Sequence, residues 1–178
     1  MNKRAICGLV LITAVLSLGS SSCKVYSFKD VSIPPEVHSI HINYIDNRAP
    51  LVNPLLAPQL NDALRQKVNN QASRLNQVLT NDADWEVSGW VSGYNYTTSG
   101  IANQVASSNR LAVTVHIVFK NHLDPTGKKV APADFEADVT RNFDFSATIT
   151  ITDAEQQLLP TIVSNLTDEI FNKLFSNW

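Results

Sequence analysis

The pattern that most limits the fold of this chain is a strict two-residue repeat of large apolar side chains. Successive side chains of a β-strand point to opposite faces, so the repeat predicts a strand with one buried face. The same spacing predicts strands over 37–45, 85–98 and 135–145, and Gly89 and Gly93 predict bulges or a bend in the second of these. The clearest repeat comprises Leu111, Val113, Val115, Ile117 and Phe119.

Two other segments repeat apolar residues at three- and four-residue spacing, which is typical of one face of a helix. The first predicts a helix over 54–79, begun by Asn53 and Pro54. The second predicts a helix over 160–176, after a short turn at 153–158, because proline is disfavoured deep inside a straight helix. The two stripes are Leu56, Leu60, Leu64, Val68, Ala72, Leu75 and Leu79, and Ile162, Val163, Leu166, Ile170, Leu174 and Phe175.

These elements follow one another in the order β-α-β-β-β-α. The segments 95–109 and 122–132 are rich in polar, Gly and Pro residues and are predicted as loops. Short connections between consecutive strands favour antiparallel pairing, and two one-faced helices cover one side of a sheet. The predicted fold class is α+β, a two-layer sandwich in which a four-stranded, mostly antiparallel sheet carries two amphipathic helices on one face.

The first 22 residues have the order of a secretory signal: basic, then apolar, then small side chains. The apolar run of 14 residues, 5–18, is shorter than the roughly 20 that span a bilayer. Cys23 follows directly, as in a bacterial lipobox, although Ser20 stands where that motif usually has leucine. We therefore predict a signal peptide over 1–22, a lipidated tether over 23–36 and a single domain over 37–178. The alternative is ordinary secretion with a free thiol.

Composition and motifs exclude several classes of function. Lys and Arg number 14 against 16 Asp and Glu, which argues against a nucleic-acid-binding protein. The four histidines do not have the spacing of a metal site, and neither a nucleophile elbow nor a glycine-rich phosphate loop is present. We predict that the protein is not an enzyme and takes no cofactor and no metal.

Basic residues gather in the second half of the chain. Arginine and lysine both bind phosphate strongly, and the cluster would form a positive patch on an otherwise acidic domain. The alternative is a solvated loop with scattered charges. The residues of this candidate phosphate-binding patch are Arg110, Lys120, Lys128, Lys129 and Arg141.

Through short motifs spread over nearly the whole segment after Cys23, the chain resembles the LptE-type lipopolysaccharide (LPS)-assembly lipoproteins of the Bacteroidota. The most specific are an Arg-Ala-Pro segment followed by a helix and a Val-x-Gly strand. The motifs are Tyr26-Ser27-Phe28, Ser32-Ile33-Pro34-Pro35, the segment 47–54, Trp85 to Gly89 with Gly93-Tyr94, and Phe143-Asp144-Phe145-Ser146.

The resemblance implies an outer-membrane lipoprotein that plugs the lumen of a large β-barrel, the LPS-assembly protein LptD. Such a protein helps the barrel to assemble and binds LPS during insertion into the outer leaflet. It implies an acyl anchor at Cys23 and a domain that faces the periplasm and the barrel lumen.

Two other functions remain open from the residues alone. A free-standing periplasmic lipoprotein could bind glycan or lipid through the aromatic side chains Trp85, Trp90, Tyr94 and Tyr96. An envelope hydrolase is the other alternative, although no residues for its chemistry were found.

Overall fold

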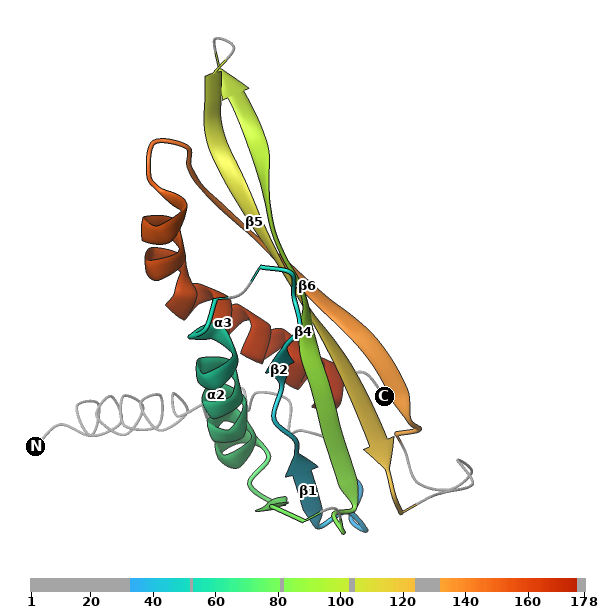
Figure 1. Ribbon diagram of the computed structural model, residues 1–178. Coiled ribbons are helices and arrows are strands. Elements are labelled where there is room, and N and C mark those ends of the chain that lie inside the picture. Colours follow the sequence, from blue (N-terminus) through green and yellow to red (C-terminus); the bar gives the residue numbers. More distant parts are fainter. Residues whose placement is uncertain (1–32, 52, 81, 103–104, 124–131, 176–178) are drawn as a thin grey trace, which may run out of the picture. The chain divides into compact units, whose positions relative to one another are not determined.

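The computed structural model describes residues 33–51, 53–80, 82–102, 105–123 and 132–175, which form one mixed sheet and two helices (Figure 1). The predicted α+β class with two helices is confirmed. In chain order the elements are β1 (Ser39–Ile42), β2 (Asp46–Asn47), α2 (Leu56–Gln71), β3 (Asn76–Val78), β4 (Trp85–Ala102), β5 (Val105–Asn121), β6 (Phe135–Ser146) and α3 (Ile151–Phe175).

The sheet differs from the four antiparallel strands that we predicted. It has six strands in the order β3-β1-β4-β5-β6, with β2 also paired to β4. Strand β1 runs parallel to β3 and β4, and β2 runs parallel to β4, whereas β4, β5 and β6 are antiparallel. The prediction failed because β2 and β3 have only two and three residues, too few to show a period.

The first predicted helix is shorter than its apolar stripe. Helix α2 ends at Gln71, where the Ala72 amide donates to the Val68 carbonyl at 2.8 Å. Leu75 is still buried in the core, but from a turn, and Leu79 is 89% exposed. Asn69 and Asn70 are weak helix formers, so the helix stops soon after them and the chain returns as β3.

The predicted loop over 95–109 is instead a continuation of β4 and β5, which form a long hairpin (Figure 1). Its register shifts near Gly93 and Gly100, so the bulge predicted at Gly93 is confirmed. At Gly89 the register is regular, and a Cβ there would lie 2.3 Å from the His116 carbonyl oxygen. Sequence analysis missed the hairpin because its residues are polar on both faces and so lack an alternation.

Helix α3 is continuous from Ile151 to Phe175 and contains Pro160. The separate turn at 153–158 is therefore wrong. Proline has no amide hydrogen, so Pro160 cannot donate to the carbonyl of Gln156 one turn earlier. Both residues are exposed, and the helix bends (Figure 1). Thr150 caps the start of the helix: its Oγ1 accepts from the Asp153 amide at 3.1 Å and donates to the Asp153 carboxylate at 2.7 Å.

The end of the predicted tether packs onto the domain. Ile33 is buried, and Arg74 donates to its carbonyl oxygen at 3.3 Å. The Val37 amide donates to the Pro34 carbonyl at 3.1 Å, so the chain turns here. Cys23 and the signal peptide lie outside the described residues.

The core lies between the helix layer and one face of the sheet. Every apolar residue of the repeat in β5 is at most 1% exposed, and Trp85 packs its ring edge-on against Phe119 at a centroid distance of 5.3 Å. Phe175 of α3 packs on the other side of Trp85, with centroids 6.1 Å apart. The residues that predicted one-faced strands and helices therefore meet in a single apolar layer.

One polar side chain in this layer connects α2 to the strand region. Asn61 is 1% exposed, and its Oδ1 accepts from the Ile45 amide at 2.9 Å. Its Nδ2 donates to the carbonyls of Ile45 at 3.1 Å and Ala57 at 2.8 Å. The side chain thus satisfies both backbone groups of Ile45 where no strand neighbour does so.

Asn61→Ala is expected to lower the free energy of unfolding by about 2–4 kcal/mol, because it leaves a buried amide and carbonyl of Ile45 without partners. The exposed Asn70→Ala on the same helix is the matched control and should change stability by less than about 0.5 kcal/mol. Urea denaturation measures both. Equal stabilities of the two variants would contradict the assigned role of Asn61.

Candidate functional site

The face of the sheet opposite the helices is the candidate functional surface, because no element of the described chain covers it. We call it the open face. The register of β4, β5 and β6 places the side chains of Trp90, His116 and Asp138 in one row across it. Most side chains in the neighbouring rows are polar as well, with Val118 and Ala112 as exceptions, so the two faces of the sheet differ strongly in polarity.

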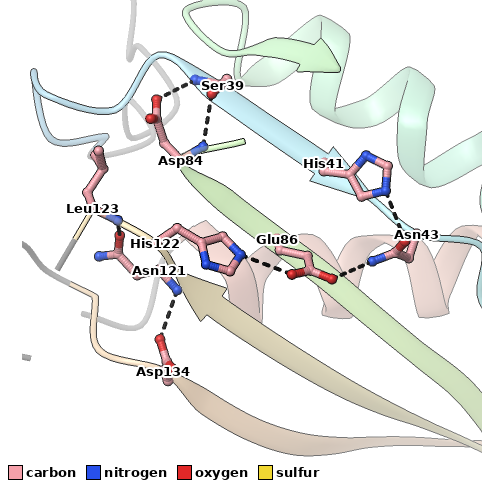
Figure 2. Close-up of polar contacts among 9 residues, drawn as sticks. All are labelled: Ser39, His41, Asn43, Asp84, Glu86, Asn121, His122, Leu123 and Asp134. Carbon is pink, nitrogen blue, oxygen red and sulfur yellow. Dashed lines mark hydrogen bonds and ion pairs between the residues drawn. The ribbon is translucent and has the colours of Figure 1, made fainter. Parts of the chain in front are cut away.

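A connected polar network lies where β1, β4 and β5 meet (Figure 2). Asn43 Nδ2 donates to Glu86 Oε1 at 2.8 Å, and His122 Nε2 donates to Glu86 Oε2 at 3.0 Å. His41 lies 2.8 Å from the Val78 carbonyl oxygen through Nδ1 and 2.9 Å from Asn43 Oδ1 through Nε2. His41 is therefore a buried structural histidine.

Glu86 is held as a carboxylate by its neighbours. Burial opposes its ionisation, but the hydrogen bonds from His122 and Asn43 and the charge of Lys120 outweigh burial, so the pKa of Glu86 lies below its ordinary value. An ionised Glu86 fixes the donor side chains on both sides of it. The side chains of this network are thus held in place by hydrogen bonds within the chain.

Asp84 joins the starts of β1 and β4. Its Oδ2 accepts from the backbone amides of His38 at 2.8 Å and Ser39 at 2.9 Å, and its own amide donates to Ser39 Oγ at 2.9 Å (Figure 2). Burial opposes ionisation of this side chain too, but the two backbone hydrogen bonds outweigh it and lower the pKa of Asp84. Asp84 and Glu86 are thus both hydrogen-bonded carboxylates at the start of β4.

The central row of the open face is a stack of rings and charges. The Arg48 guanidinium lies 4.8 Å from the Trp90 ring centroid, and the Trp90 and His116 ring centroids are 4.4 Å apart. His116 Nδ1 lies 2.8 Å from Asp138 Oδ1, and Nε2 lies 3.6 Å from Glu136 Oε2. Strand parity alone could have placed Trp90 and His116 outward, but their pairing and the contact of Arg48 depend on a register that the sequence does not specify.

The four aromatic residues proposed as a glycan platform do not share a face. Trp90 lies on the open face, whereas Trp85 and Tyr94 are buried under the helices. Tyr96 donates through its hydroxyl to Glu155 of α3 at 2.5 Å, and burial together with this bond raises the pKa of Tyr96. The arrangement therefore offers no continuous aromatic strip for a sugar.

The predicted basic patch is not one cluster among the described residues. Arg110 donates to both carboxylate oxygens of Asp144, at 2.7 and 3.0 Å, on the open face. Lys120 is on the same face opposite Glu86, but ten residues further along β5, or roughly 33 Å away. Arg141 is on the helix side, paired with Glu169 of α3. Lys128 and Lys129 lie outside the described residues.

Comparison with known proteins identifies the family. A family model described as LptE, lipopolysaccharide-assembly, matches residues 37–174. The chain belongs to the LptE family. No curated protein matches the sequence of this LptE-family chain.

Solved structures share the fold at low identity. An uncharacterized lipoprotein B from Nitrosomonas europaea is similar with a TM-score of 0.52 at 12% identity, over 84% of this chain and 89% of that one. The rare lipoprotein B from Shewanella oneidensis has a TM-score of 0.49 at 8% identity, over 76% and 90% of the two chains. No helix in the described ranges of this LptE-family chain is long and apolar enough to span a membrane.

The hydrogen bonds that Asp84 accepts from the His38 and Ser39 amides predict a free energy of unfolding that depends on pH. Asp84→Asn should unfold about 1–2 kcal/mol more easily at pH 7, because charge-assisted hydrogen bonds become neutral ones. Since the folded pKa is lowered, the stabilising contribution is present above about pH 4 and is lost as pH falls through the folded pKa. The difference in free energy of unfolding between wild type and variant, measured by urea denaturation, should therefore become smaller as the pH is lowered from 5 to 2.

The matched control is Asp82→Asn at an exposed position two residues earlier. It should leave the pH dependence of unfolding close to that of wild type. If the difference in free energy of unfolding between wild type and Asp84→Asn stayed constant with pH, it would contradict the role assigned to the ionised Asp84.

Proposed function

We propose that this chain is a non-catalytic lipoprotein of LPS transport, anchored to the outer membrane by an acylated Cys23 after removal of residues 1–22. Its domain faces the periplasm and occupies the lumen of an LptD-type β-barrel partner, whose assembly it assists. Membership of the LPS-assembly family supports the general role. The lipid anchor, the barrel and direct binding of LPS are the finer parts of the proposal.

The observation that supports a plug is the open face and its paired polar side chains. Some charges on it are paired in place, as in Arg110 with Asp144, and hydroxyls pair across strands, as in Thr114 with Thr140 at 3.0 Å. The lumen of a large outer-membrane barrel is polar and hydrated. A face whose side chains are already fixed loses little conformational freedom when it docks against such a wall.

We propose that LPS phosphates bind the five basic side chains Arg110, Lys120, Lys128, Lys129 and Arg141. Arg110 and Arg141 already hold carboxylates, so a phosphate group would compete with Asp144 and Glu169 for them. Lys120 lies beside a cavity of about 300 Å³ lined also by Asp134, Phe135 and Glu136, where an anion would meet mixed charge. The proposal therefore gives Lys128 and Lys129 the largest share.

Affinity purification of the tagged chain from detergent-extracted membranes tests the barrel partner. A large outer-membrane barrel protein should co-elute at about one copy per chain, identified by mass spectrometry. Cys23→Ala is the companion variant and should move the chain to the soluble fraction in cells that lack the barrel. Recovery of the chain alone and monomeric would overturn the plug and favour a free-standing glycan- or lipid-binding lipoprotein.

Replacing both Lys128 and Lys129 with Glu should weaken binding of purified LPS about tenfold, since each reversed charge costs on the order of 0.5–1 kcal/mol. The wild-type affinity should also fall as salt is raised, because salt screens the attraction between lysine and phosphate charges. Lys173→Glu on α3 is the charge-reversal control and should bind like wild type. LPS binding that is unchanged in the double variant would remove these lysines from the site.

A further inference from the structure

The outer edge of β6 is a long strand edge that no described part of the chain pairs with. Strand β6 is the last in the order of the sheet and has 12 residues (Figure 1). At about 3.4 Å per residue the edge is roughly 40 Å long. The opposite margin is formed by β3, which has only three residues.

Proteins usually protect such an edge, and β6 lacks most of the usual devices. It is not short, and it contains neither proline nor lysine. Its register with β5 continues without a bulge from the Ser108–Ser146 pair to the Phe119–Phe135 pair. Arg141 is an inward-pointing charge, but Glu169 of α3 neutralises it. The edge is therefore regular and competent to pair with another strand.

The charges beside the edge specify what can pair there. Asp144 is balanced by Arg110 across the strand, and this contact keeps its pKa low and its carboxylate ionised. Asp138 and Glu136, at the other end, share His116 as their neighbour on β5. The residues of β6 that point to the open face contain acidic but no basic side chains: Glu136, Asp138, Thr140, Asn142, Asp144 and Ser146.

A second copy of the chain fits this edge poorly. Antiparallel self-pairing of β6 would place the acidic row of one copy beside the acidic row of the other, and like charges on facing strands are destabilising. A strand with basic side chains on the same face would gain cross-strand ion pairs instead. The charge pattern thus disfavours a homodimer and favours a basic partner strand.

We infer that β6 receives an extended strand of a partner polypeptide that carries Lys or Arg on the open-face side. Backbone hydrogen bonds along the free edge hold the added strand, and Glu136 and Asp138 select its charge. The strand carries Arg141 and the Asp144 partner of Arg110, but the pairing of its backbone edge goes beyond the proposed function. Its test uses the purified chain alone, so its outcome does not depend on a barrel partner.

The probe is a ten-residue synthetic peptide of alternating Thr and Lys, added to the purified full-length chain. Amide hydrogen exchange is measured across β6. At a peptide concentration about ten times the Kd, the edge amides within 135–146 should exchange about tenfold more slowly. The same peptide methylated at every backbone nitrogen, and a peptide of alternating Thr and Glu, should not protect them.

Asn142→Lys adds a like charge beside the added strand and should weaken binding of the Thr-Lys peptide about two- to fivefold. Asn70→Lys on α2 makes the same substitution at an exposed site of the helix layer and should leave binding unchanged. Three results would overturn the inference. They are no protection of β6, equal protection by the methylated peptide, and protection without peptide that rises with protein concentration, which would mean self-association.

Discussion

The structure depends on a sheet that is covered on one side only. The large apolar residues of β4 and β5 point toward α2 and α3, where Trp85, Phe119 and Phe175 pack together. The opposite face must then be stable in contact with water, and its side chains satisfy one another across strands. The ring stack at Trp90 and the carboxylate network at Glu86 are consequences of this division.

Periodicity predicted those parts of the fold in which one face is buried. The repeat that ends at Phe119 gave a strand, and the stripe through Leu64 gave a helix. It failed where burial does not alternate. Residues 95–109 form a hairpin because their backbones pair, although both faces are polar, and β2 is two residues long. Leu75 continues the helical stripe from a turn, so the stripe overstated the length of α2.

The candidate site was harder to predict than the fold, because charge density along a sequence does not give position in space. Arg110 and Arg141 belong to the same basic segment of the sequence, yet they lie on opposite faces of the sheet with different carboxylate partners. The positions of Trp85 and Trp90 differ by five, an odd number, so the alternation of side chains along a strand places them on opposite faces of the sheet. Arg48 contacts Trp90 only because β2 pairs with β4, and the sequence carries no signal for that pairing.

The central claim is that the open face, and not the helix layer, meets the partner. Hydroxyl-radical footprinting of the chain alone and in complex with the proposed barrel partner tests this claim, with buried Trp85 as internal reference. We predict that oxidation of Trp90 slows at least several-fold in the complex, while exposed Leu79 and Ile151 react as before. Unchanged oxidation of Trp90 together with protection of the exposed residues of α2 and α3 would contradict the account.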